Sequence, residues 1–163
     1  ARRMVSSYVV TQDDMVRKKD PYDSVGLASY GLDDFPFATI ANNGKIALSG
    51  GELSIVYIGD GLRNTSEEGD LFISPGAGMY KIPYRSITPF ENECSNLIVP
   101  VCCSASHIVM TSLRMEPVWM ILGESAGVAA HLAIEEGGVV QDVNYLRLRN
   151  RLLELDQILD IPT

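Results

Sequence analysis

The chain has 163 residues, 21 of them acidic and 13 basic, which gives a formal net charge of −8. That length allows one domain with a substantial core. The acidic balance argues against a nucleic-acid partner, because phosphate contacts need a basic surface. Three cysteines without C-x-x-C spacing make no disulfide framework, and two histidines add too few ligands for a metal site. We therefore expect no structural metal.

No stretch predicts a signal peptide or a membrane span. The best candidate, Val118–Ile134, is short and contains Glu124, Ser125 and two glycines. We expect a soluble chain that does not bind membranes, and the sequence leaves its compartment open.

The first half of the chain is predicted to hold one helix followed by mostly antiparallel strands. Arg3–Lys19 is predicted to be helical, with Thr11 and Asp14 as a capping box and Asp20-Pro21 as its end. Asn43-Gly44 is a strong hairpin turn signal. Strands are predicted over residues 24–30, 35–41, 46–48, 53–58 and 79–84.

The second half is predicted to be strand, loop, helix, loop and helix. Asn96–Val101 is a short apolar run of strand type, and Cys102–Ser112 is small, polar and irregular, as a loop near a ligand would be. Pro117 suits the first turn of a helix. The apolar residues continue to Ile134, and Gly137-Gly138 ends the run.

Small residues share one face of that long helix. Gly123, Ala126, Gly127 and Ala130 fall at i, i+3, i+4 and i+7. Glycine inside a helix costs about 1 kcal/mol relative to alanine, so the face suggests close approach by a neighbouring backbone or a flat ligand. A final surface helix is predicted over Asn144–Leu155, with its arginines on the solvent side. Its apolar positions are predicted to be Leu146, Leu152, Leu153 and Leu155.

A family resemblance centres on Leu97–Ile134, LIVPVCCSASHIVMTSLRMEPVWMILGESAGVAAHLAI. This stretch resembles the C-terminal flavin-binding segment of bacterial FAD-dependent oxidoreductases of the glutathione-reductase/fumarate-reductase superfamily, of the xanthan-lyase-related type. Asp23–Tyr30, Tyr80–Pro89 and Val140–Asn144 are also similar to family segments, in the family's order. Phe35–Gly78 matches least.

The resemblance implies an α+β fragment of an α/β FAD-binding (Rossmann-like) flavoprotein. Residues 1–90 would end a substrate-binding domain, with one helix and antiparallel strands. Residues 91–138 would supply the last strand and the flavin-facing helix of the FAD-binding domain, and residues 139–163 a C-terminal helix and tail. The activity implied is hydride transfer with a small organic substrate, sugar derivatives being one class.

The same resemblance implies a site where the Ser104–Val118 loop enters the helix. A helix start presents unpaired N–H groups and about half a positive charge, which suits the flavin edge that gains negative charge on reduction. His107 would be the catalytic proton donor or acceptor, unless it only hydrogen-bonds a loop carbonyl. The predicted cofactor contacts are Ser112, Arg114, Met115, Glu116, Pro117 and Val118, and the predicted substrate contacts are Tyr84, Arg85, Ser104 and Ser106.

Two of these positions have competing interpretations. Arg85 could bind a substrate carboxylate or the flavin through its forked donors, or it could pair with Glu91 or Glu93 to hold a loop, which we favour. Arg114 and Glu116 could likewise form an internal ion pair.

A rival motif lies inside the long helix. Gly123–Gly127 reads G-x-S-x-G, the nucleophile elbow of α/β-hydrolases, with Ser125 as the nucleophile of a serine esterase. The only histidine after it, His131, is less than two helical turns away and could not reach back as a base. A non-catalytic interaction module is the third function class that we keep.

The chain lacks a dinucleotide fingerprint. A G-x-G-x-x-G between a strand and a helix is needed, and neither Gly59-Asp60-Gly61 nor Gly76-Ala77-Gly78 qualifies. We expect these residues to be incomplete without an N-terminal FAD-binding portion, to bind FAD weakly or not at all alone, and to self-associate through the uncovered face.

Overall fold

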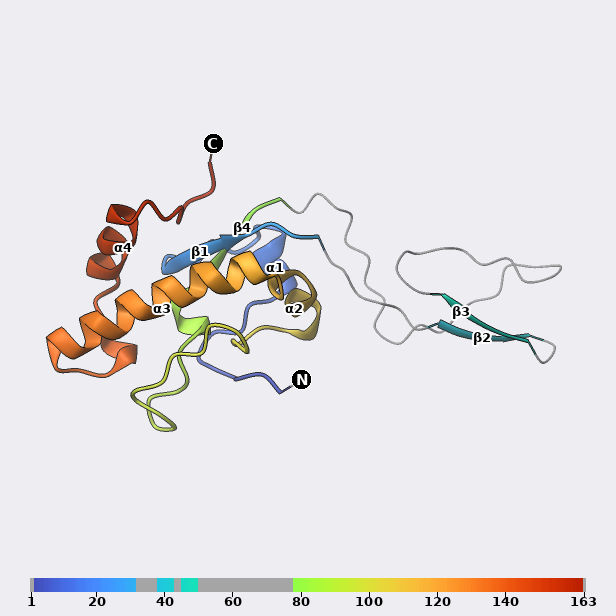
Figure 1. The fold of residues 1–163 in the computed structure, drawn as a ribbon, viewed down its shortest axis with the longest axis horizontal. Helices are drawn as coiled ribbons and strands as arrows, with labels where there is room; N and C mark the ends of the chain where they lie inside the picture. The colour runs from blue at the N-terminus through green and yellow to red at the C-terminus, as the bar shows by residue number, and fades with distance from the viewer. Residues whose placement is uncertain (1, 32–37, 43–44, 50–77, 163) are drawn as a thin grey trace.

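The computed structural model describes residues 2–31, 38–42, 45–49 and 78–162, with side chains in the first and last of these ranges (Figure 1). The strands are β1 (Ser24–Ala28), β2 (Ala38–Asn42), β3 (Lys45–Ser49) and β4 (Tyr80–Pro83). The α-helices are α1 (Gln12–Met15), α2 (His107–Leu113), α3 (Glu116–Glu136) and α4 (Tyr145–Glu154). Two short 3₁₀ turns, η1 (Tyr84–Ser86) and η2 (Val140–Asp142), complete the elements. This arrangement is the mixed α+β organisation predicted from the sequence.

Two antiparallel strand pairs make up the described sheets. β1 pairs with β4, with Ala28 opposite Tyr80 and Ser24 opposite Pro83. β2 pairs with β3 from Ala38–Ser49 to Asn42–Lys45, which leaves two residues between the strands and confirms the predicted hairpin. The turn itself, and the strand predicted over residues 53–58, lie outside the described residues.

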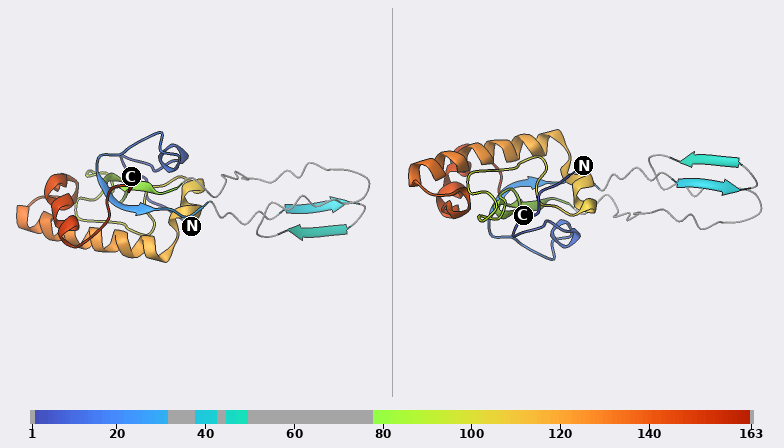
Figure 2. Two further views of the ribbon diagram at one scale, coloured as in Figure 1. Left: turned by 90° about the horizontal axis from the view of Figure 1, so that it is seen from above. Right: turned by 90° about the horizontal axis from the view of Figure 1, so that it is seen from below.

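The long helix α3 covers the β1–β4 pair (Figures 1 and 2). Its buried face presents Val118, Leu122 and Ala129 to the core, and α3 contacts β1 more than any other element. The approach is close at Gly26 of β1, where an added Cβ would lie 2.5 Å from Cγ2 of Ile121. Glycine at this position therefore lets the helix sit directly on the strand.

The ends of α3 are those that the sequence predicts. Pro117 lies in the first turn, and Gly137 closes the helix in the left-handed conformation with φ of 62°. The small-residue face points away from the core, and a Cβ added at Gly123 or Gly127 would meet nothing within 4 Å. The close approach that we expected at this face is therefore not made by any part of the chain that the structure describes.

The helix predicted over Arg3–Lys19 is wrong except for its centre. Only α1 is helical there, and it begins at the predicted capping box of Thr11 and Asp14, in which the Asp14 carboxylate accepts a hydrogen bond from the Thr11 N–H at 2.8 Å. The preceding segment instead runs beside the Cys102–Ser106 loop, with the Met4 N–H donating to the Cys102 carbonyl at 2.9 Å. Hydrogen bonds to a distant segment have overridden the local helical pattern.

Two further predictions in the second half are corrected. Asn96–Val101 is irregular, because no strand in the described ranges lies beside it to complete a ladder; the Val99 N–H donates instead to the Ile87 carbonyl at 2.7 Å. The predicted Cys102–Ser112 loop ends early, since α2 begins at His107. Ser106 starts α2 by accepting a hydrogen bond from the Val109 N–H at 3.4 Å.

The C-terminal helix α4 is confirmed with a different buried face. Asn144 caps it by accepting hydrogen bonds from the N–H groups of Leu146 and Arg147. Leu148 and Leu152 are fully buried, whereas Leu146, Leu153 and Leu155, expected on the apolar side, are exposed. The arginines of α4 form surface ion pairs with Glu135, Glu136, Glu154 and Asp160.

One helix in the described ranges, α3, has the length and hydropathy of a membrane span, and a third of that window is buried within the protein. The candidate rejected from the sequence, Val118–Ile134, was shorter than α3, and length and composition alone do not separate α3 from the core helix of a globular domain. No group of three or more potential metal ligands occurs among the described residues.

Candidate functional site

The N-terminus of α3 is open to a ligand. Its N-cap residue, Met115, has no side-chain acceptor for the first N–H groups, and Glu116 and Pro117 are exposed. The Val118 and Trp119 N–H groups both donate to the Met115 carbonyl, at 3.0 and 3.1 Å. By contrast, α2 and α4 are capped by serine and asparagine side chains. The longest helix of the described chain thus keeps the positive end of its dipole without a side-chain cap.

The short helix α2 directly precedes the start of α3, and hydrogen bonds of the buried Ser112 hold it in place. Ser112, fully buried, donates a hydrogen bond to the Tyr30 carbonyl, and its Oγ lies 2.7 Å from the Tyr80 hydroxyl. Burial raises the pKa of Tyr80 above its ordinary value, so the phenol stays neutral. The buried Ser112 hydroxyl therefore joins α2 to the β1–β4 pair, which is a positioning role in place of the predicted cofactor contact.

His107 stands at the other end of α2. It is the first residue of the helix and is exposed. Between it and the start of α3, the Arg114 Nε donates to the Thr111 carbonyl at 3.3 Å. His107 and the backbone from Arg114 to Val118 thus lie at the two ends of one short, anchored helix, where the sequence predicted an irregular loop.

The loop before His107 is pinned on two sides. Ser104 is fully buried; its N–H donates to the Ser86 carbonyl at 2.8 Å, and its Oγ accepts from the Ser6 N–H at 3.1 Å. The Val10 N–H donates to the Ser104 carbonyl at 3.0 Å, and the Ser106 N–H donates to the Val10 carbonyl at 2.9 Å. Ser104 was predicted to touch substrate, but its burial makes it a residue that holds the loop.

Arg85 forms an internal ion pair, as we favoured, with a different partner. Its Nε and Nη2 donate to the two carboxylate oxygens of Asp23, each at 2.9 Å, rather than to Glu91 or Glu93. Asp23 is 2% exposed, and hydrogen bonding to it raises the pKa of Arg85. The guanidinium also lies over the rings of Tyr8 and Tyr22, 4.9 and 4.8 Å from their centroids.

Tyr84 lies next to Arg85 and is buried. Its hydroxyl donates to the Val140 carbonyl at 2.7 Å, and burial raises the pKa of the phenol. The prediction that Tyr84 binds substrate directly is corrected on this ground, because a hydroxyl engaged inside the core has no ligand-facing surface. Asp23, Tyr8 and Tyr22 were missed from the sequence, since nothing local pairs them with Arg85.

The rival serine motif does not form an elbow. Ser125 lies in the middle of the continuous helix α3 and is fully buried. Its hydroxyl donates to the Val25 carbonyl at 2.6 Å, and it lies 3.0 Å from Oε1 of Gln157. His131 is exposed on the same helix and pairs with Glu135 at 3.2 Å. A nucleophile must be exposed on a strand-to-helix turn with a base in reach, so the esterase interpretation is contradicted.

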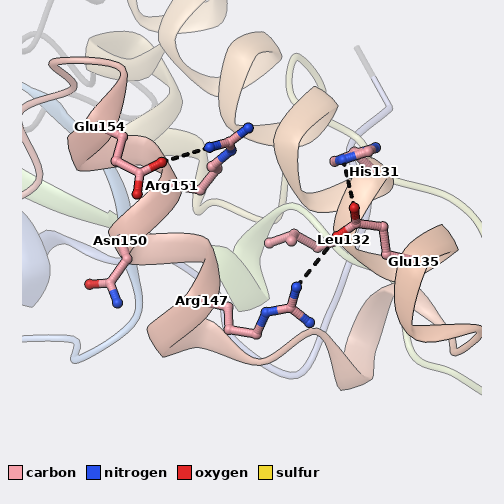
Figure 3. A pocket seen from close by; sticks show the side chains of 7 residues that line it. All are labelled: His131, Leu132, Glu135, Arg147, Asn150, Arg151 and Glu154. Atoms are coloured by element: carbon pink, nitrogen blue, oxygen red, sulfur yellow. Dashed lines mark hydrogen bonds and ion pairs between the residues drawn. The ribbon is translucent and has the colours of Figure 1, made fainter.

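Among the described residues, two shallow clefts lie away from this site. One, of about 280 Å³, runs between α3 and α4 (Figure 3) and is lined by His131, Leu132, Glu135, Arg147, Asn150, Arg151 and Glu154. Its charged side chains pair with one another. The other, of about 350 Å³, lies beside α1 and holds Lys81 between Asp20 and Asp160. Neither adjoins the start of α3 in sequence.

Comparison with known families decides the broad function. The model of the FAD dependent oxidoreductase family matches residues 1–152 of the chain. The chain belongs to this family. Searches of curated proteins and of solved structures gave no match. The family has FAD as its cofactor and implies an FAD-binding α/β fold and oxidoreductase chemistry, which confirms those parts of the sequence prediction.

The residues present fit that cofactor at one place. An exposed helix start without a side-chain cap supplies N–H donors and positive potential to a carbonyl or anionic edge. Flavin has such an edge at N1 and the C2 carbonyl. Of the predicted contacts, Met115 and Glu116 have the backbone N–H groups that could hold it, because the N–H groups of Arg114 and Val118 donate to the Met110 and Met115 carbonyls.

Proposed function

We propose that this chain is the C-terminal portion of an FAD-dependent oxidoreductase of the glutathione-reductase/fumarate-reductase superfamily, of the xanthan-lyase-related type. The enzyme would work by hydride transfer on a small organic substrate, with sugar derivatives as one class. The observation that carries the proposal is the exposed N-terminus of α3, which has no side-chain cap in a chain of an FAD-dependent family.

The start of α3 would hold the pyrimidine edge of the flavin. Bound FAD supplies the hydride acceptor or donor. The helix start contributes fixed N–H dipoles that need no rearrangement when negative charge develops next to them. Pro117 lacks an N–H and the Val118 N–H donates to the Met115 carbonyl, so the donors at the helix start would come from Met115 and Glu116.

His107 would exchange a proton with the substrate. It is exposed at the start of α2, on the same anchored segment as the start of α3. A neutral imidazole carries one unprotonated ring nitrogen, so His107 can take a proton from a substrate hydroxyl at Nδ1 or Nε2 and return it. Ser106, half-buried beside it, is the remaining candidate for substrate contact.

The dinucleotide-binding part would be supplied from outside these 163 residues. The proposal rests on the missing G-x-G-x-x-G, since FAD pyrophosphate needs that turn at a helix start. The chain alone would then bind FAD weakly or not at all. Its exposed apolar residues on α3, Met120 and Ile134, would favour self-association of the isolated chain.

An absorption spectrum tests the proposal. The purified product of the complete gene should show a flavin spectrum, and residues 1–163 prepared alone should show none. A His107→Gln variant of the complete product should keep its flavin and lose turnover with its substrate, because only the proton acceptor is removed. Absence of flavin from the complete product after reconstitution with FAD would contradict the proposal.

A further inference from the structure

The pair formed by Asp23 and Arg85 is the most highly connected charged group in the described chain. The buried Asp23 carboxylate accepts hydrogen bonds from the Arg85 N–H, Nε and Nη2 at 3.1, 2.9 and 2.9 Å. The Asp23 carbonyl also accepts from the Tyr84 N–H at 2.7 Å. One aspartate thus fixes both the backbone and the side chain of Arg85 in η1. The two parallel hydrogen bonds to its carboxylate need the forked donors of a guanidinium.

Two aromatic rings, Tyr8 and Tyr22, lie against this pair, and we call the four residues together the clamp. Tyr8 and Tyr22 each place a ring within 5 Å of the Arg85 guanidinium carbon. Tyr22 meets Tyr145 of α4 edge-on, with ring centroids 6.1 Å apart, and the Tyr8 hydroxyl bonds to Asp14 of α1. The clamp therefore joins the N-terminal segment, β1, η1 and the start of α4.

Hydrogen bonds connect Arg85 and Ser86 to the loop that precedes His107. The Arg85 carbonyl accepts a hydrogen bond from Ser6 Oγ at 2.6 Å, and the Ser86 carbonyl accepts from the Ser104 N–H at 2.8 Å. The Ser6 N–H in turn donates to Ser104 Oγ. Ser104 is thus held from both sides by groups whose position depends on Arg85, three residues before His107.

A comparison with other ion pairs shows that this one is unusual. Arg147–Glu136 and Arg151–Glu154 have both side chains partly or well exposed, and such pairs contribute little to stability. The Asp23 side chain is 3% exposed and that of Arg85 is 37% exposed, so the buried carboxylate depends on Arg85 for its hydrogen bonds while the outer edge of the guanidinium reaches solvent. The pair therefore adds to the local hydrogen bonds of η1, which run from the Ile87 N–H to the Tyr84 carbonyl and from Ser86 Oγ to the Pro83 carbonyl.

We propose that Asp23 and Arg85, stacked between Tyr8 and Tyr22, are positioning residues that set the Ser104–His107 loop against the flavin. This inference rests on the proposed function, because it takes that loop to border the cofactor. Arg85 acts here through Ser6 and Ser104 and touches neither flavin nor substrate.

The test uses the product of the complete gene with Arg85→Lys and Arg85→Gln, and Arg147→Gln as the matched control. Lysine keeps the charge and loses the fork, and glutamine loses both. FAD affinity and the visible circular dichroism of bound flavin are measured at a temperature where far-ultraviolet spectra show each variant folded. We expect both Arg85 variants to raise the FAD dissociation constant about tenfold or more and to change the flavin dichroism, and Arg147→Gln to do neither.

The outcomes separate the alternatives. A lysine variant with wild-type affinity and dichroism would overturn the inference, because charge alone would then suffice. Unchanged flavin properties in both variants, with only a lower melting temperature, would overturn it as well, since Arg85 would then serve stability alone. If the wild-type product carries no flavin, the proposed function fails and the inference falls with it; if it does, the Arg85 variants decide the inference independently.

Discussion

The beginning and the middle of α3 offer two different chemistries on one helix. The middle holds a G-x-S-x-G whose serine is fully buried and bonded to the Val25 carbonyl. The beginning holds no recognisable catalytic motif, yet it is exposed and has no side-chain cap. A short motif indicates a function only when the backbone around it has the matching conformation. A serine buried inside a continuous helix is not presented to a substrate as a nucleophile.

The largest loss of stability that we expect comes from a substitution at the contact between the middle of α3 and β1. Gly26→Ala would place a Cβ 2.5 Å from Cγ2 of Ile121 and should lower the free energy of unfolding by about 1–3 kcal/mol. Gly123→Ala is the matched control, because its Cβ would meet nothing within 4 Å and should raise helix stability by up to about 1 kcal/mol. Chemical denaturation of both variants measures the difference. Equal effects at the two glycines would show that α3 does not rest on β1 in this way.

The second effect concerns Ser125 itself. Ser125→Ala should cost about 1–2 kcal/mol, because the Val25 carbonyl loses a buried donor. Ser7→Ala, at an exposed serine, should change stability by less than about 0.5 kcal/mol. A fluorophosphonate probe should leave the wild-type chain unlabelled at Ser125. Labelling there would contradict the structural role and revive the esterase interpretation.

The two regions of α3 differ in how far the sequence could predict them. Pro117 and Gly137 predict both ends of the helix, because each residue has a backbone preference that acts locally. The clamp of Asp23 with Arg85 joins residues 62 positions apart, and no local pattern pairs them. The segment before α1 was mispredicted for the same reason: its hydrogen bonds go to Cys102 and Ser104. The candidate site over Ser104–Val118 is a prediction from the resemblance, and the packing alone shows that the Ser104 and Ser112 hydroxyls are buried.

A third, smaller effect tests the beginning of α3. Met115→Asp would supply the side-chain acceptor that the N-cap position lacks and should stabilise the chain by about 0.5–1 kcal/mol. Met115→Leu is the control, since it keeps the apolar side chain and adds no acceptor. Thermal unfolding compares the two. A loss of stability with aspartate would indicate that the start of α3 is already satisfied.

The loop before α2 holds two neighbouring cysteines, one exposed and one buried. Cys102 is exposed, and burial raises the pKa of the Cys103 thiol from 9.0 to about 11. A thiol whose pKa is higher in the folded state gives stability that is lost as pH rises from 9 towards 11, by about 1 kcal/mol between pH 9 and 10. Cys103→Ala should flatten the stability curve over that interval, and Cys102→Ala should not. Identical curves for the two variants would argue against this burial difference.

The midpoint potential of bound flavin in the product of the complete gene tests the central claim most directly. It is measured by dithionite titration for the wild type, Met115→Asp and Met115→Leu. If the start of α3 faces the flavin, the aspartate variant should have a more negative potential than both others, because its carboxylate opposes the charge gained on reduction. Equal potentials in all three proteins would show that the start of α3 does not face the flavin.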